Sequence, residues 1–244
     1  EMKKSIFAAA ALIIAFSFTG GLMAETITLT EVEGAWMNPV GGEDVVITNG
    51  GDADAVDVVT WGVPYPSSST NKSGYAFDAI PTIGIGSPDD GTYSLTVDVG
   101  TPFLLGEFCH ENWVIDTDTG ITSVDLSLMI SGFDSPINAT FTFNHDETFN
   151  TDDPEASRDI VTITGDNNLK TAVMYGGNDY VFELLGFSED SGQTLSTDFY
   201  TYEEANNYAG LWAVVNPVPE PTSLLLLGSG IGALGLVAYR RRKN

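Results

Sequence analysis

Cysteine is almost absent from this sequence, since Cys109 is the only one among 244 residues. A single thiol excludes a disulfide within the chain, even in an oxidising compartment. Such a residue can pair between two chains, but a lone cysteine is more often buried as a small hydrophobic side chain. We therefore expect Cys109 to be packed in the interior.

Basic residues are also scarce. The chain has 9 lysines and arginines against 34 aspartates and glutamates, and six of the nine lie within the first four or the last five residues. The body between them keeps Lys72, Arg158 and Lys170 against 32 acids (34 without Glu1 and Glu220), a charge near −29. A surface this acidic repels nucleic acid and anionic lipid headgroups, so neither is predicted as a partner.

Helical periodicity is missing from the body. Apolar residues instead recur at every second position, with Thr and Ser between them, which predicts strands with one buried and one solvated face. The predicted strands are 26–30, 92–99, 123–131, 139–143, 160–164 and 180–184. Clusters of Gly, Asn, Asp and Pro predict turns at 49–52, 88–91, 116–120, 165–168 and 176–179. We predict an all-β fold, an antiparallel β-sandwich of jelly-roll type, as one domain over residues 25–218.

The N-terminus has the three regions of a secretory signal peptide. A short basic region at 2–4 precedes an apolar run over 6–18, and a small residue, Ala24, stands at the cleavage position. We predict that the secretion translocon exports the chain and that signal peptidase removes residues 1–24.

The C-terminus, residues 219–244, combines three physically different pieces. A Pro-Glu-Pro triplet forms an extended spacer, because its prolines resist helix. Residues 222–239 then carry no charge, and as a helix they would rise about 27 Å at roughly 1.5 Å per residue, near the thickness of a bilayer's hydrocarbon core. Four cations follow, and such a cluster stays on the cytoplasmic side. The triplet is Pro219, Glu220 and Pro221, and the basic stop is Arg240, Arg241, Arg242 and Lys243.

This tripartite order resembles the PEP-CTERM sorting signal of Gram-negative bacteria, which an exosortase recognises during export of surface proteins. The resemblance implies an inner-membrane precursor held by the C-terminal transmembrane helix, and a mature form at the outer cell surface or outside the cell. A plain membrane anchor has the same apolar span and positive end. The Pro-Glu-Pro triplet favours sorting.

The middle of the body carries a second resemblance. Residues 103–115 resemble the F-x-L-G-x-F-T-H-x-N-x-P-I core of choice-of-anchor K domains, and residues 144–150 resemble that family's E-T-P-N segment. Cys109 stands where Thr is usual, and Val114 and Phe149 stand where Pro is usual. These domains are exported on varied anchors, PEP-CTERM among them, and membership implies no activity.

The two histidines, His110 and His145, lie in these two segments. Together with an acid such as Glu111 or Glu147 they form a metal site if the segments are neighbours in space. The alternative, which we favour, is that polar side chains of the two segments pin loops onto the sandwich through hydrogen bonds. The residues concerned are His110, Asn112, Glu147 and Asn150.

Calcium is the cofactor that the acidic loops favour. Asp152, Asp153 and Glu155 offer hard oxygen ligands around a proline, and extracellular calcium fills weak sites. Residues 116–120 begin like an EF-hand loop, but the Gly comes one place early and the twelfth position is not Glu, so no EF-hand is predicted. The alternative, which we favour, is a solvated acidic surface.

Catalytic motifs are absent as well: no G-x-S-x-G, Walker loop or C-x-x-C appears in the body. We therefore predict a non-catalytic surface or matrix protein associated with exopolysaccharide or biofilm. One alternative is a carbohydrate-binding module, and a less favoured one is a secreted glycoside hydrolase, which needs two carboxylates facing a cleft. The aromatics that could stack on sugars if exposed are Trp36, Trp61, Tyr65 and Trp113, although we expect most of them to pack in the core.

Overall fold

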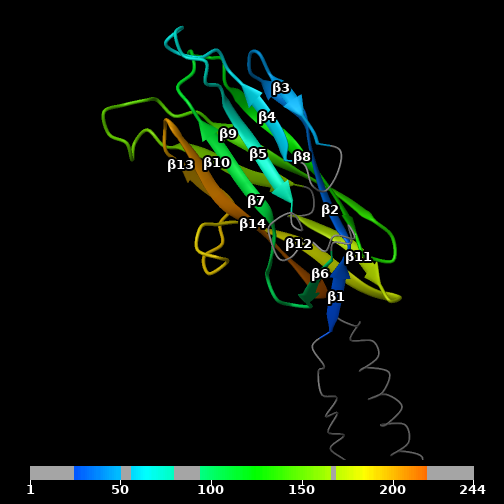
Figure 1. Ribbon diagram of the computed structural model, residues 1–244. Helices are drawn as coiled ribbons and strands as arrows, with labels where there is room; N and C mark the ends of the chain where they lie inside the picture. Colours follow the sequence, from blue (N-terminus) through cyan, green and yellow to red (C-terminus); the bar gives the residue numbers. More distant parts are fainter. Residues whose placement is uncertain (1–24, 51–55, 80–93, 166–168, 219–244) are drawn as a thin grey trace, which may run out of the picture.

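The structure is a computed structural model that describes residues 25–50, 56–79, 94–165 and 169–218 (Figure 1). The predicted signal peptide (1–24) and the predicted sorting segment (219–244) lie outside the described residues. Within the described ranges, no helix has the length and apolar character needed to cross a membrane.

Strands and turns make up the described residues, and every strand pairing is antiparallel. One sheet has five strands in the order β13-β10-β9-β8-β2, a second has seven in the order β11-β12-β14-β7-β5-β4-β3, and β1 pairs with β6. The two larger sheets form the layers of a sandwich (Figure 1), which confirms the predicted antiparallel β-sandwich. The strands are β1 (Thr26–Leu29), β2 (Glu31–Gly41), β3 (Val46–Thr48), β4 (Asp57–Trp61), β5 (Ser73–Ala79), β6 (Leu95–Asp98), β7 (Phe103–Asn112), β8 (Ile121–Ser131), β9 (Ile137–Asp146), β10 (Asp159–Gly165), β11 (Lys170–Tyr175), β12 (Asn178–Ser188), β13 (Asp198–Thr201) and β14 (Ala205–Pro217).

The alternation in β8 shows why these residues form a sandwich. Val124, Leu126, Leu128 and Ile130 are fully buried, whereas the residues between them are partly exposed. Period-two alternation puts all four apolar side chains on the face that meets the other sheet. Burying each of them contributes about 1.5–3 kcal/mol relative to leaving it in water.

Aromatic rings fill the space between the two layers. Trp36 of β2 and Phe143 of β9 come from the five-stranded sheet, and Tyr75 of β5 and Phe108 of β7 come from the seven-stranded sheet. The ring centroids of Phe108 and Phe143 are 5.4 Å apart, and those of Trp36 and Tyr75 are 5.7 Å apart. These contacts across the layers fix how the sheets sit on each other.

The predicted turn at 176–179 closes the β11–β12 hairpin. Gly176 and Gly177 adopt φ of 58° and 76°, which a tight two-residue hairpin requires. Both of their N–H groups donate to the Asp134 carboxylate, at 2.8 and 2.9 Å. Asp134 thereby links the β8–β9 connection to a hairpin of the other sheet.

Candidate functional site

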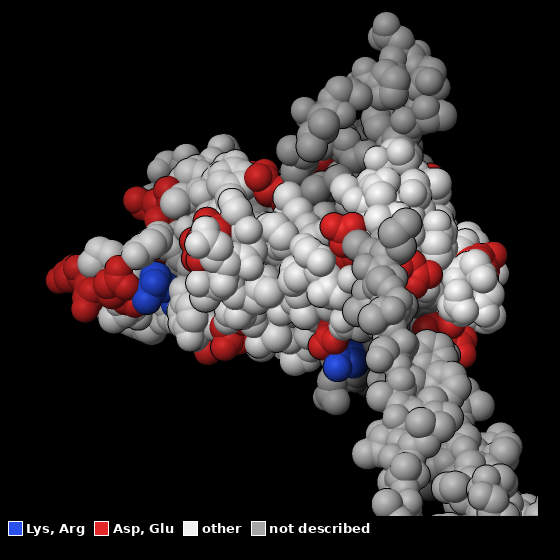
Figure 2. Space-filling model, turned by 90° about the horizontal axis from the view of Figure 1, so that it is seen from below, with Lys and Arg blue, Asp and Glu red and all other residues white. Residues whose placement is uncertain are grey.

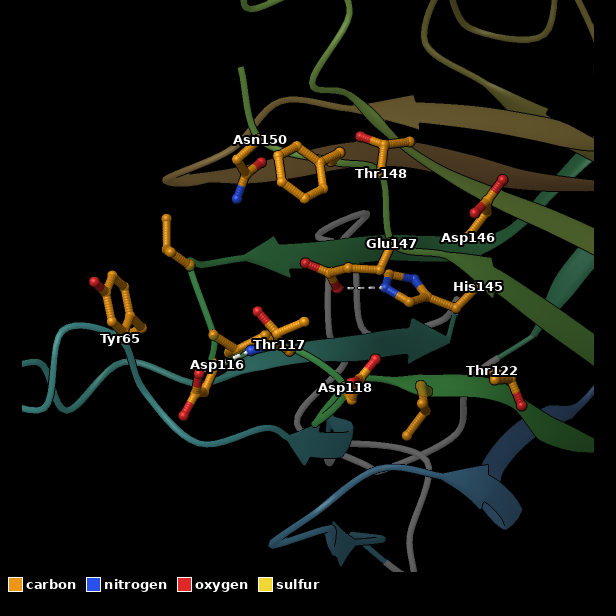
Figure 3. A pocket seen from close by; sticks show the side chains of 15 residues that line it. Tyr65, Asp116, Thr117, Asp118, Thr122, His145, Asp146, Glu147, Thr148 and Asn150 are labelled. Atoms are coloured by element: carbon orange, nitrogen blue, oxygen red, sulfur yellow. Dashed lines mark hydrogen bonds and ion pairs between the residues drawn. The ribbon is translucent and has the colours of Figure 1, made fainter. Parts of the chain in front are cut away.

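An open polar groove lies at one end of the sandwich, with a cavity volume of about 820 Å³. The polar groove is lined by Tyr65, 114–118, 120–122 and 145–150, which belong to the β4–β5, β7–β8 and β9–β10 connections and the strand ends beside them. In Figure 3 the labelled side chains of Asp116, Asp118, Glu147 and Asn150 gather round the same space. Three connections from two sheets therefore build one concave surface.

Backbone hydrogen bonds hold two of these connections together. Tyr65 N–H donates to Val114 O at 3.1 Å, and Asp116 N–H donates to Val63 O at 2.7 Å. The Thr119 hydroxyl donates to Asp116 O at 2.6 Å and closes the predicted turn at 116–120. The backbone that carries the Tyr65 side chain is therefore fixed by hydrogen bonds to the β7–β8 connection.

Exposed aromatic rings flank the polar groove. Tyr65 is 59% exposed and Phe149 is 86% exposed, the highest value among the large apolar side chains of the described residues. Trp36 and Trp61 are packed in the core, the fate expected for most of the candidate stacking aromatics. They are 1% and 0% exposed because their indoles fill the space between the sheets, and Trp113 is half-buried.

A buried polar cluster lies beneath the polar groove. It consists of His110, His145 and Asp159, whose ligating atoms all lie within 4.8 Å of one another. His110 comes from β7 of the seven-stranded sheet, while His145 of β9 and Asp159 of β10 come from the five-stranded sheet. All three residues are buried, so the cluster fills the space between the layers.

A hydroxyl group holds each imidazole at its Nδ1 atom. His110 Nδ1 lies 2.8 Å from Thr201 Oγ1, and His145 Nδ1 lies 2.7 Å from Tyr75 Oη. Both contacts cross between the sheets, since Thr201 is on β13 and Tyr75 is on β5. The Nε2 atoms are left to face the interior of the cluster.

Several polar atoms of this region have no hydrogen-bond partner among the described residues: His110 Nε2, Asn112 Oδ1, Asp159 Oδ2 and both carboxylate oxygens of Glu203. Buried polar atoms are nearly always paired, so this concentration is unusual. His145 Nε2 has one close partner, the Glu147 carboxylate at 3.1 Å (Figure 3).

The pKa values in the cluster are shifted mainly by burial. Burial, and then the neighbouring His145, hold the pKa of His110 well below its usual range. Burial, and then the charge of Glu147, raise the pKa of Asp159 to about 6. Burial, and then the charges of Asp159 and Glu147, raise the pKa of Glu203 to about 8. Each shift favours the neutral form, because burial penalises the charged form of all three groups; for Asp159 the neighbouring His145 opposes the shift in part.

Carboxylates continue from the cluster toward solvent. Glu147, Asp159 and Glu203 also bring carboxylate oxygens within 4.8 Å of one another. Asp159 is shared by both groups and is held from behind by Thr148 N–H, which donates to Asp159 Oδ1 at 2.8 Å. The donor set is therefore two imidazoles and three carboxylates, graded from buried to exposed.

Sequence analysis predicted part of the buried cluster. His110, His145 and Glu147 come together, but Glu111 does not join them because it follows His110 on β7 and points to the opposite face. Asn112 Nδ2 lies 3.5 Å from Thr201 Oγ1, and Asn150 lines the polar groove. Sequence reasoning missed three residues of the cluster and its supports: Asp159, Thr201 and Tyr75.

The calcium candidates Asp152, Asp153 and Glu155 lie in the exposed loop between β9 and β10. Asp153 Oδ1 accepts the Glu155 N–H at 3.1 Å, and the Glu155 carboxylate pairs with Arg158 at 2.9 Å and accepts the Tyr202 hydroxyl at 2.6 Å. Their calcium role stays a prediction. In the described ranges, the groups of converging metal-ligand atoms contain none of the three.

Comparison with known proteins bears on the C-terminus. Residues 217–243 match the family described as the PEP-CTERM protein-sorting motif. No curated protein matches the chain, and the resemblance of the body to choice-of-anchor K domains is not confirmed. The matched range contains the Pro-Glu-Pro triplet, the uncharged stretch and the cations. This chain therefore carries a PEP-CTERM sorting motif, which indicates an exported surface protein that an exosortase processes.

Proposed function

We propose that the body is a non-catalytic domain that binds neutral polysaccharide at the cell surface, associating the protein with exopolysaccharide or biofilm. One observation carries this proposal: Tyr65 and Phe149 remain exposed beside a groove lined by carboxylate, amide and hydroxyl side chains. Sugars present apolar ring faces that stack on aromatic side chains, and hydroxyl groups that donate to carboxylates. The polar groove offers both kinds of contact.

The charge of the body selects among polysaccharides. Acidic side chains are spread over the face shown in Figure 2, and cations are few. An anionic polymer would be repelled by this surface, whereas a neutral one meets no such barrier. We therefore favour a neutral glycan.

The arrangement of carboxylates supports binding over hydrolysis. A glycosidase needs two carboxyl groups that both reach the substrate, roughly 5–9.5 Å apart. Asp159 has no exposed surface, and its neighbours Glu147 and Glu203 converge on it within 4.8 Å. Converging carboxylates with one buried member suit an ion better than a sugar ring between them.

Affinity electrophoresis tests this function. The full chain should migrate more slowly in gels that contain hydroxyethyl cellulose, dextran or galactomannan, at least one of the three, and should be unaffected by alginate. The double variant Tyr65→Ala/Phe149→Ala should lose at least tenfold in affinity, because stacking contributes most of the contact. Tyr200→Ala removes an exposed aromatic outside the polar groove and serves as the matched control. Equal retardation of both variants would overturn the proposal.

The motif also supports a defined route to the surface. The precursor is held in the inner membrane by residues 222–239 until the exosortase cuts near Pro219–Pro221. Replacing Glu220, or deleting Arg240–Lys243, should leave full-length chain in the inner-membrane fraction, which intact mass measures. Normal export of both variants would contradict this route.

A further inference from the structure

We infer that His110, His145 and Asp159 form a binding site for a divalent transition-metal ion, of which Zn²⁺ fits the donors best. The site lies under the polar groove, between the two sheets. It shares His145 and Glu147 with the lining of the polar groove, whereas the exposed aromatics Tyr65 and Phe149, which carry the proposed glycan binding, take no part in it.

The first argument is that ligand atoms without partners converge. His110 Nε2 and Asp159 Oδ2 belong to fully buried residues and have no hydrogen-bond partner among the described residues. Asp159 Oδ2 lies 4.0 Å from His145 Nε2. An unpaired buried donor or acceptor destabilises the folded protein, so such atoms are rare. Two of them within 4.8 Å of each other, beside His145, indicate that something absent from the polypeptide joins them.

The second argument is that the hydrogen bonds behind the imidazoles are those of metal ligands. The Thr201 hydroxyl donates to Asp159 O at 3.5 Å, so it is free to accept from His110 Nδ1–H. That tautomer places the lone pair of His110 on Nε2. His145 Nδ1 is supported by the Tyr75 hydroxyl; because His145 Nε2 donates to the Glu147 carboxylate when no ion is bound, an ion at Nε2 requires the imidazole proton to stand on Nδ1 and donate to Tyr75 Oη. Histidines that bind metals nearly always use one nitrogen for the ion and the other for such a support.

A fourth ligand is available at the boundary with the polar groove. Glu147 Oε2 lies 3.1 Å from His145 Nε2, and the Glu147 side chain is 31% exposed. Ligand atoms around tetrahedral zinc are separated by about 3.3 Å, so the spread of 4.8 Å must contract by about an ångström and a half when the ion binds. Because Glu147 is exposed on the groove side, the ion has an entry path, and Glu147 can swing to close it.

The donor types decide the class of ion. Calcium and magnesium prefer six or more oxygen ligands, whereas imidazole nitrogens with carboxylates suit zinc and its neighbours. Two carboxylates and two neutral imidazoles around a divalent cation also give a neutral centre, which a buried position requires.

The small number of histidines allows a decisive test of metal binding. The chain contains 2 histidines, so an untagged protein whose metal shows two imidazole ligands must bind it at this site. The full chain, solubilised in detergent and stripped with chelator, is titrated with ZnCl₂, and with CoCl₂ for its visible spectrum. We expect one ion per chain, tetrahedral Co²⁺ bands, and X-ray absorption that reports two imidazoles per zinc.

Variants separate metal binding from a purely structural cluster. His110→Gln and Glu147→Gln should weaken zinc binding by at least 100-fold and at least tenfold, respectively. Asp153→Asn, in the exposed acidic loop, should leave it unchanged. Chelation should lower the melting temperature of the wild type and leave that of folded His110→Gln unaffected.

Three outcomes would overturn the inference: no stoichiometric zinc binding by the wild type, a bound ion with fewer than two imidazoles, or saturation by CaCl₂ in place of zinc. If His110→Gln does not fold, the imidazole count of the wild type and the Glu147→Gln titration still decide it. Glycan retardation is measured separately with zinc present and with chelator, so failure of one proposal does not conceal the other.

Discussion

Tyr75 Oη lies 2.7 Å from His145 Nδ1, and this buried contact joins β5 of one sheet to β9 of the other. The two rings meet edge to face, with centroids 5.8 Å apart. A single hydroxyl group thus links the layers of the sandwich at the end where the polar groove opens.

Removing that hydroxyl should destabilise the fold. Tyr75→Phe keeps the ring but leaves His145 Nδ1 buried without a partner, which costs about 1–3 kcal/mol. Urea unfolding of chelator-treated protein measures the change. Tyr65→Phe removes an exposed hydroxyl and should stay within about 0.5 kcal/mol of the wild type. A Tyr75→Phe variant as stable as this control would mean that the contact contributes nothing.

Asp57 should make stability depend on pH in an unusual direction. Burial raises the pKa of this β4 carboxyl from 3.8 to about 6. A hydrogen bond from Gly50 N–H lowers the pKa, and the charge of Asp78 raises it further. Between these two values the folded state binds more protons than the unfolded state, so stability falls as pH rises from about 4 to about 6. Asp57→Asn keeps the acceptor oxygen and should gain on the order of 1 kcal/mol at pH 7.5 relative to pH 4.

Urea titrations at both pH values measure this difference, and Asp190→Asn is the control that should show almost no difference over this range, because the proton uptake of Asp190 falls mainly below pH 4. Hydrogen bonds from Thr194 N–H and the Ser188 hydroxyl lower the pKa of Asp190 to about 2. Its contribution is present at neutral pH and lost as pH falls through the folded value. If Asp57→Asn gained no stability relative to the wild type between pH 4 and pH 7.5, burial would not raise the pKa of the Asp57 carboxyl.

Gly186 should tolerate no side chain. It lies at the bulge in β12 with φ of 112°, and a Cβ there would collide with the Ser196 carbonyl oxygen. Gly186→Ala should lower the free energy of unfolding by more than about 2 kcal/mol, because alanine is strained at this φ and the backbone near Ser196 must also move to make room for the methyl group. Gly176→Ala, with φ of 58° and no atom near its Cβ, should cost about 1 kcal/mol. Denaturant unfolding midpoints, compared where the m-values are equal, measure the stability of the two variants. Equal losses of stability in both would show that the collision at Gly186 is relieved at no cost.

Cys109 should be inert in the folded protein. It is 7% exposed, and burial raises the pKa of its thiol to about 11, so almost no thiolate is present at pH 8. Iodoacetamide should modify it only after unfolding, as intact mass will report, and no disulfide-linked dimer should form. Ser68→Cys places a second thiol on an exposed turn and should react within minutes. Rapid alkylation of native wild type would contradict this.

The alternation in the sequence was enough to predict the layers. A strand such as β8 can be predicted because every second residue is apolar. The Gly-Gly pair at 176–177 predicts a hairpin turn, because glycine adopts the positive φ that the turn needs without steric cost. The order of strands was beyond reach, since pairing of β14 with β7 depends on contacts about a hundred residues apart. A single sequence contains no record of such contacts.

The cluster was only half visible for a similar reason. With two histidines in the chain, His110 and His145 attract attention at once. Asp159 does not, because it is one of 34 acidic residues and acquires its position through the register of β10 with β9 and β13. Thr201 and Tyr75 act through hydroxyl groups that lie at hydrogen-bond distance only once the sheets are stacked.

The place of β14 in the seven-stranded sheet has a consequence for export. This strand (Ala205–Pro217) lies between β12 and β7, and it ends where the sorting motif begins. An interior strand of the sheet is therefore the last strand of the body to be synthesised. Until it arrives, β7 and β12 have open edges toward each other and the sheet cannot close. The strand that closes the sheet and the sorting motif are thus adjacent in the chain, so the body completes its sheet only once the residues next to its export signal have been made.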